Sequence, residues 1–200
     1  FSILIGYTNI NLGKADAAYK YFDDALIADP DNRWALKGKA RAALINEDYD
    51  LAEEVYGLLL NLEPGHKGYT MKRCVALLKM GKFSEVREEL FRLDYQYPDD
   101  MNVKRLLAWA MLSDDNLEKA SQLYDTLLSE CPVPEDYINA GYCQWAMGNI
   151  ERAVEYFRDW MARSGGDTEQ LLKEFRRDTD TLSKYNISET DEYLMLSLVA

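Results

Sequence analysis

The sequence contains few of the residues that build metal centres or disulfide frameworks. Histidine occurs once in 200 residues, and cysteine occurs three times, as Cys74, Cys131 and Cys143. This odd number of cysteines includes no C-x-x-C pair, so neither a zinc site nor a disulfide scaffold is predicted. We expect all three cysteines to be buried as small apolar residues. No metal and no cofactor is expected.

Catalytic signatures are missing as well. The single histidine, His66, follows Pro64 and Gly65 in a turn, where an exposed loop residue is expected. There is no G-x-S-x-G nucleophile elbow and no glycine-rich phosphate loop. The carboxylates have the spacing of a solvated helix face, as in Glu53 and Glu54. The sequence therefore predicts a protein that is not an enzyme.

Long apolar runs and excess positive charge are also absent. No stretch approaches the roughly 20 apolar residues that a membrane-spanning helix needs. Lys and Arg total 23 against 35 Asp and Glu, which gives a formal net charge of −12. Nucleic-acid phosphates attract basic surfaces, so this balance excludes nucleic acid as an expected partner. Direct insertion into a membrane is not expected either.

The sequence does contain an internal repeat. Four of its five prolines are 34 residues apart: Pro30, Pro64, Pro98 and Pro132. The same step joins small residues at Gly6, Ala40, Cys74 and Ala108, and large apolar residues at Phe22, Tyr56, Leu90 and Tyr124. It also joins Gly13, Glu47, Gly81 and Asp115, where a tight turn is expected. A fixed period of this length predicts stacked helical hairpins, each ended by a proline.

A fifth unit follows with one residue deleted after Pro132. The predicted units are 1–32, 33–66, 67–100, 101–133 and 134–166. Their first helices are predicted near 1–12, 33–46, 67–80, 101–114 and 134–147. Their second helices are predicted near 15–28, 49–62, 83–96, 117–130 and 150–163. Trp160, in the last of these, is expected to be a core residue.

Residues 167–200 depart from the repeat. Asp167, with Gln170 three residues later, predicts a helix start, and Ser188 predicts another. This tail is expected to be either a capping segment for the array or a degenerate sixth repeat. The chain begins at Phe1 inside an apolar helical pattern, which suggests a piece of a longer protein. The compartment is not determined, although a cytoplasmic location is weakly favoured.

The pattern resembles the tetratricopeptide repeat (TPR) family over about residues 1–165. In the first unit the resemblance rests on Gly6, Ala18, Phe22, Ala25 and Pro30. In the second it rests on Ala40, Tyr49, Ala52, Tyr56 and Pro64, and in the fifth on Gly141, Ala153 and Phe157. Of the family's early aromatic positions, only Tyr137 is kept. The resemblance implies an all-α, right-handed superhelical α-solenoid of about five TPR helix–turn–helix repeats with a C-terminal helical cap.

The resemblance also implies where a partner binds. The first helix of each TPR unit lines a concave groove, and carrying over the groove positions gives Tyr7, Trp34, Lys37, Arg41, Met71, Lys79, Arg105, Trp109, Tyr142 and Trp145. Predicted helices 33–46 and 67–80 each hold four basic residues and no acidic one, whereas the second helix near 48–63 is acidic. Basic residues beside aromatic ones favour an acidic, partly apolar peptide as ligand.

Other interpretations remain open at this stage. Trp109 and Trp145 are alternatively packing residues between first helices, and Lys39 and Arg73 alternatively extend to the surface without binding anything. Some TPR proteins clamp a C-terminal carboxylate, but the asparagines that should accompany Lys37 and Arg41 are missing, so that clamp is not predicted. The leading hypothesis is a scaffold or adaptor. The alternatives are a self-associating structural module and a targeting domain for an activity encoded elsewhere.

Overall fold

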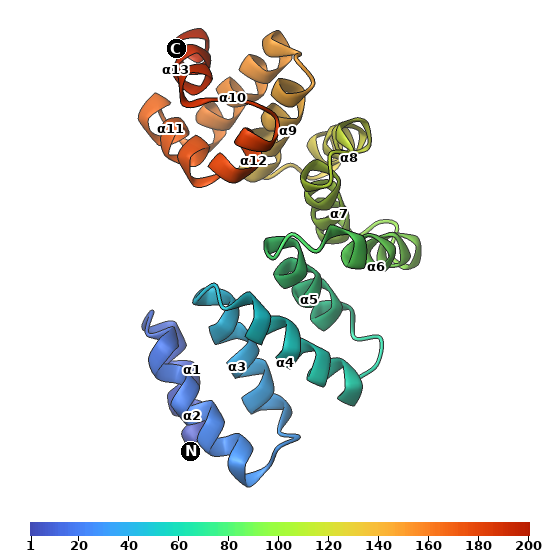
Figure 1. Cartoon of the computed structure of the whole chain (residues 1–200), viewed down its shortest axis with the longest axis vertical. Coiled ribbons are helices and arrows are strands. Elements are labelled where there is room, and N and C mark those ends of the chain that lie inside the picture. Colours follow the sequence, from blue (N-terminus) through green and yellow to red (C-terminus); the bar gives the residue numbers. More distant parts are fainter. The chain divides into compact units, whose positions relative to one another are not determined.

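The computed structural model describes all 200 residues. It contains thirteen α-helices joined by turns and loops, and no strand (Figure 1). The predicted first helices are α1 (Ser2–Asn11), α3 (Arg33–Ile45), α5 (Lys67–Lys79), α7 (Met101–Ser113) and α9 (Pro134–Ala146). The second helices are α2 (Ala15–Ala28), α4 (Tyr49–Leu62), α6 (Phe83–Gln96), α8 (Leu117–Glu130) and α10 (Ile150–Ser164). The tail forms α11 (Thr168–Arg177), α12 (Thr179–Lys184) and α13 (Glu189–Val199). All ten predicted repeat helices are confirmed, and each bound agrees within one residue.

The turn between the two helices of each hairpin has the same conformation in every unit. Gly13, Glu47, Gly81 and Asp115 have positive φ angles of 72°, 59°, 72° and 62°, and Gly148 in the fifth unit has 80°. A residue in this left-handed region reverses the chain directly after the first helix. The tight turns predicted from the 34-residue step are therefore confirmed, including the two at which the sequence has an acidic residue.

Capping side chains begin the tail helices where the sequence predicts them. The Asp167 carboxylate accepts a hydrogen bond from the Gln170 N–H at 2.9 Å, and the Gln170 side chain accepts one from the Asp167 N–H at 2.8 Å. Ser188 and Asp191 form the same reciprocal arrangement at the start of α13. Each pair satisfies backbone donors that a helix start leaves unpaired.

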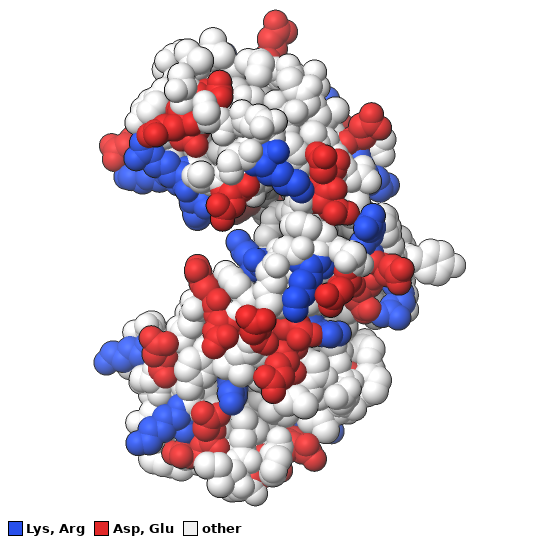
Figure 2. All heavy atoms as spheres, viewed as in Figure 1, with Lys and Arg blue, Asp and Glu red and all other residues white.

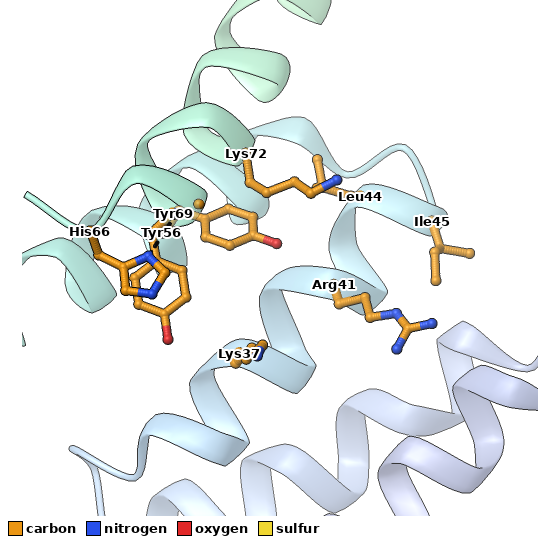
Figure 3. A pocket seen from close by; sticks show the side chains of 9 residues that line it. Lys37, Arg41, Leu44, Ile45, Tyr56, His66, Tyr69 and Lys72 are labelled. Atoms are coloured by element: carbon orange, nitrogen blue, oxygen red, sulfur yellow. Dashed lines mark hydrogen bonds between the residues drawn. The ribbon is translucent and has the colours of Figure 1, made fainter. Parts of the chain in front are cut away.

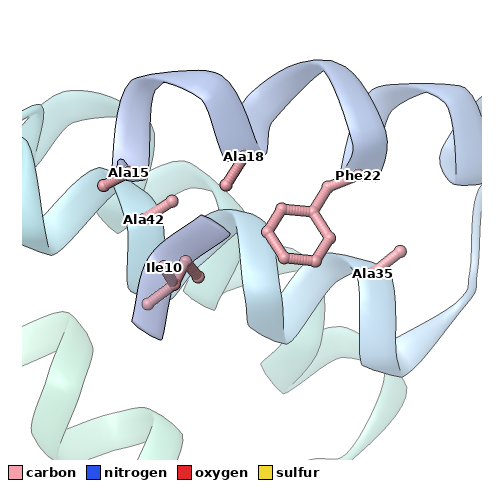
Figure 4. Packing of buried hydrophobic residues seen from close by; sticks show 6 residues of the cluster. All are labelled: Ile10, Ala15, Ala18, Phe22, Ala35 and Ala42. Carbon is pink, nitrogen blue, oxygen red and sulfur yellow. The ribbon is translucent and has the colours of Figure 1, made fainter. Parts of the chain in front are cut away.

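Close contact between a glycine and a phenylalanine ring holds the first and fifth hairpins together. The Phe22 ring lies between α2 and α3, with alanines of both helices around it (Figure 4). A Cβ atom added at Gly6 would lie 2.6 Å from Cε1 of this ring, so α1 can approach only because position 6 has no side chain. Gly141 meets Phe157 in the same way in the fifth unit.

The chain divides into two compact units, the N-terminal unit (Phe1–Tyr95) and the C-terminal unit (Gln96–Ala200). In the N-terminal unit, α2 packs against α1 and α3, and α4 packs against α3 and α5. In the C-terminal unit, α8 packs against α7 and α9, α10 packs against α9, and α11 and α13 pack against each other and against α10. No helix combines the length and the apolarity needed to cross a bilayer.

Burial agrees with the sequence at most of the singled-out positions and corrects one. Trp160 is buried, as predicted, and so are Cys74 and Cys143. Cys131 is exposed, so its predicted burial is wrong. It follows the last residue of α8 and precedes Pro132, and a residue that ends a helix in an inter-repeat turn has no neighbouring helix to cover it.

Candidate functional site

The N-terminal unit contains a pocket of about 530 Å³ between α3, α4 and α5. Its lining residues are Lys37, Arg41, Leu44, Ile45, Tyr56, His66, Gly68, Tyr69 and Lys72. Figure 3 shows one wall built by α3 and the opposite wall built by the start of α5, with the Tyr69 hydroxyl pointing into the space between them. This pocket brings basic and aromatic side chains together and includes no acidic one.

Helix periodicity places the α3 wall. Lys37, Arg41, Leu44 and Ile45 follow one another at steps of four, three and one residues, so they share one face of the helix. Lys37, Arg41 and Ile45 are exposed and Leu44 is half-buried. The opposite face of α3 buries alanines against α2. The pocket wall is therefore the side of α3 that the hairpin packing leaves open.

His66 fixes the α5 wall. Its Nδ1 accepts a hydrogen bond from the Tyr69 N–H at 3.2 Å, and its ring stacks on the Tyr69 ring with 3.7 Å between centroids. The residue is exposed, as predicted, but it is also the N-cap of α5, a role that the sequence analysis missed. By capping the helix and stacking on Tyr69, it positions the ring that enters the pocket.

The three cations of the pocket differ from the other basic residues of α3 and α5. Arg33 pairs with Glu63 at 2.9 Å, Lys39 with Asp23 at 2.7 Å, and Arg73 with Glu53. None of the ion pairs of the unit includes Lys37, Arg41 or Lys72. Lys39 and Arg73 thus reach acidic residues of the preceding second helices, which supports the interpretation that they do not face a ligand.

The distribution of charge across the unit follows from this pairing. On the face shown in Figure 2, acidic side chains gather over α4, the helix that contributes Glu53. The acidic second helices neutralise part of the positive charge of the first helices and leave Lys37, Arg41 and Lys72 uncompensated. The basic residues predicted along α3 and α5 are thus divided: several are paired with acidic residues, and the three unpaired ones named here line one pocket.

Aromatic hydroxyl groups line the pocket in their neutral form. Burial raises the pKa of Tyr56 to about 12, and the Arg41 charge acts weakly in the opposite direction. Burial also raises the pKa of Tyr69. Both phenols therefore remain protonated at neutral pH and can donate hydrogen bonds, and the pocket carries a net positive charge.

The other predicted groove residues of the N-terminal unit lie outside the pocket. Trp34 is 66% exposed at the start of α3, and the Lys37 ammonium lies 5.7 Å from the centroid of its ring. Tyr7 is half-buried; its ring meets Phe22 edge-on at 5.3 Å, and its hydroxyl donates to the Trp34 carbonyl at 3.0 Å. Met71 is half-buried and Lys79 is exposed, but neither lines the pocket.

The predicted groove residues of the C-terminal unit are engaged within the fold. Arg105 forms an ion pair with Asp136, whose Oδ2 is 3.0 Å from Nε, and also donates to the Cys131 carbonyl. Trp109 is half-buried. Tyr142 and Trp145 are buried, because Phe175 of α11 packs on both rings at centroid distances of 6.0 and 5.3 Å. These two residues are therefore not exposed along an open groove, and Trp145 packs against Phe157 of α10 and Phe175 of α11 rather than between first helices.

Comparison with known families decides the identity of the repeats. Tetratricopeptide repeat models match residues 4–65 and 137–159. The chain contains tetratricopeptide repeats. This confirms the resemblance inferred from the proline period and the small residues. No curated protein matches the chain.

Solved structures with TPR folds are similar to this chain over most of its length. A TPR protein from Parabacteroides merdae aligns with a TM-score of 0.76 at 16% identity, covering 99% of this chain and 82% of the other. MamA from Desulfovibrio magneticus RS-1 aligns with 0.71 at 20% identity, covering 82% and 93%. YrrB, described as a TPR protein with an unusual peptide-binding site, aligns with 0.64 at 16% identity, covering 86% and 90%. At these identities the likeness supports the fold alone.

Proposed function

We propose that this chain is a scaffold or adaptor that binds an extended acidic, partly apolar segment of a partner protein in the pocket between α3 and α5. TPR folds are protein–protein interaction modules, and the chain has this fold. The observation that supports the finer proposal is the set of three cations, Lys37, Arg41 and Lys72, that have no acidic partner in a protein of net charge −12.

The composition of the pocket walls supports a ligand with both kinds of side chain. Leu44, Ile45 and the rings of Tyr56 and Tyr69 offer apolar surface, whereas the cations stand around it. A carboxylate of the partner gains charge-assisted hydrogen bonds from Lys or Arg, and a neighbouring apolar side chain gains burial against the rings. The position of Trp34 beside Lys37 extends this surface toward the start of α3.

Binding can be tested with a fluorescein-labelled peptide, Glu-Phe-Glu-Glu-Leu-Glu, amidated at its C-terminus so that it offers only side-chain carboxylates. We expect Arg41→Glu to weaken its affinity at least tenfold, which corresponds to about 1.4 kcal/mol, because a close attraction becomes a repulsion. Fluorescence anisotropy measures the affinity. A matched control is Lys20→Glu, which makes the same charge change at an exposed position of α2 outside the pocket.

Two results would contradict the proposal. One is equal weakening by both substitutions, which would show a response to net charge alone. The other is that the unmodified chain binds the peptide and the Arg41→Glu variant binds it with the same affinity. A second peptide in which Ser replaces Phe and Leu separates the apolar contribution, and we expect it to bind more weakly than the original peptide.

A further inference from the structure

The repeat period identifies the place in the C-terminal unit that corresponds to the pocket. Two steps of 34 residues carry Lys37 and Arg41 to Arg105 and Trp109 of α7, and Leu44 to Leu112. Tyr69 corresponds to Asp136 once the single deletion is counted. At this place Arg105 is paired with Asp136, so the open basic pocket of the N-terminal unit has no counterpart here.

The tail of the chain lies over the corresponding face of α7 and α9. From the tail, Tyr185 donates its hydroxyl proton to the Leu112 carbonyl, and the Lys184 ammonium donates to the Ser113 carbonyl. On α9, the buried Tyr142 hydroxyl donates to the Asp178 carboxylate at 3.2 Å. These contacts join segments that are 71 to 73 and 36 residues apart in sequence, and α12 lies beside α9 in Figure 1.

Two of these contacts use backbone carbonyls at the C-terminal end of α7. The last carbonyls of α7 have no partner within the helix and carry the negative end of its dipole, so they favour donors and cations. Lys184 and Tyr185 supply both. Leu182, one turn earlier, is fully buried. The segment that supplies these donors thus combines a buried apolar side chain with two hydrogen-bond donors that follow it in sequence.

The segment that makes these contacts is short. Residues 178–187, called the cover segment below, contain only the six-residue helix α12. A helix of this length is not stable by itself in water, so its conformation depends on the contacts with α7 and α9. It begins at Asp178, the C-cap of α11, and near its end Asn186 has a positive φ of 58°. The neighbouring α11 and α13 pack against α10 and against each other, and α11 also contacts α12.

We propose that the face of α7 and α9 is a second interaction surface, occupied in this structure by the chain's own cover segment. Its partner is a protein segment that presents an apolar side chain followed by hydrogen-bond donors, as Leu182, Lys184 and Tyr185 do. Binding of such a partner requires displacement of the cover segment. This surface is separate from the basic pocket: the pocket favours acidic side chains, whereas this surface favours hydrogen-bond donors and cations.

Hydrogen exchange of the full chain tests whether the cover segment is displaceable. We expect the amides of residues 179–187 to exchange at least tenfold faster than those of α9 and α10, because the segment can open without unfolding the unit. Exchange as slow as that of α9 would show that the segment is an integral part of the core and would overturn the proposal.

A peptide added in trans tests whether the face is an interaction surface. The probe is a fluorescein-labelled synthetic peptide with the sequence of residues 178–187. We expect it to bind the double variant Lys184→Ala/Tyr185→Phe at least fivefold more tightly than the unmodified chain, in which the tethered segment competes at high effective concentration. The matched control Lys173→Ala changes an exposed lysine of α11 and should leave the affinity unchanged.

The outcome does not depend on whether the basic pocket functions, because the two surfaces lie in different units. Circular dichroism establishes that the double variant is folded, and Tyr185→Phe alone, which keeps the ring, provides a milder test. Equal binding of the peptide to the variant and to the unmodified chain, or equal binding of a scrambled peptide, would overturn the proposal.

Discussion

At the scale of single residues, side chains at equivalent positions of different repeats have different surroundings and hydrogen bonds. Tyr124 occupies the position that Phe22 and Tyr56 occupy in other units. The Tyr56 side chain lines the pocket, whereas the Tyr124 hydroxyl is buried without a hydrogen-bond partner. A buried polar group without a partner costs about 1–3 kcal/mol. The position tolerates this cost because the rest of the ring fills the core.

We expect Tyr124→Phe to stabilise the chain by about 1 kcal/mol, because the substitution removes an unpaired hydroxyl and keeps the ring. Urea unfolding followed by circular dichroism measures the change. Tyr142→Phe is the control, because the hydroxyl of Tyr142 bonds to Asp178 and its removal should destabilise the chain. Destabilisation by both substitutions would show that the Tyr124 hydroxyl has a partner in solution.

The three thiols should differ strongly in reactivity. Burial raises the pKa of the Cys74 thiol to about 12 and that of Cys143 to about 11, whereas Cys131 is exposed. Because the thiolate is the reactive form, we expect one fast-labelling thiol per chain at pH 8 and two that react only on unfolding. Absorbance after addition of an aromatic disulfide reagent counts them, and Cys131→Ser should abolish the fast phase. A fast phase of more than one thiol would contradict the assigned burial.

At the scale of helices, the ends determine what the surface offers. The N-cap of α5 is a histidine that also stacks on a ring of the pocket, and the C-terminal end of α7 is bonded by donors from the tail. At α5 an unpaired backbone donor binds the residue directly before the helix, and at α7 unpaired carbonyls bind side chains from the tail. The pocket and the covered face are consequences of how these two helices terminate.

We expect His66→Ala to destabilise the chain by about 1 kcal/mol, because α5 loses its N-cap. The same change should weaken binding of the acidic peptide, since Tyr69 loses the ring that holds it in place. His66→Asn restores a capping side chain without the stacking, so it should recover most of the stability and little of the affinity. Urea unfolding and anisotropy report the two effects separately, and parallel recovery of both would argue against a role for stacking.

At the scale of the whole molecule, a strongly acidic chain has a local cationic site. At 0.1 M salt the Debye length is about 10 Å, so the acidic residues elsewhere act only weakly on a ligand in the pocket. We therefore expect the cations of the pocket to dominate the interaction with a ligand bound there. The overall charge of −12 and a preference for acidic ligands are therefore compatible.

We expect affinity for the acidic peptide to fall at least threefold between 50 and 300 mM NaCl, because the pocket is open to solvent and its charges are screened. Anisotropy titrations at several salt concentrations measure the slope. Arg41→Glu should show a smaller slope. Affinity that rises with salt would mean that repulsion by the acidic surface, not attraction by the pocket, controls binding.

The sequence by itself determined the helices, the turns and the repeat. A 34-residue period is a local property, because each hairpin repeats a small residue on its first helix and a large apolar one on its second, as with Gly6 and Phe22. Only the tertiary structure decided which of the basic residues remain uncompensated and which groove positions are accessible. Lys39 finds Asp23 on a neighbouring helix, and Trp145 lies beneath Phe175 of the non-repeating tail. Pairing and burial of this kind depend on which residues of different helices meet in space, and the period does not specify that.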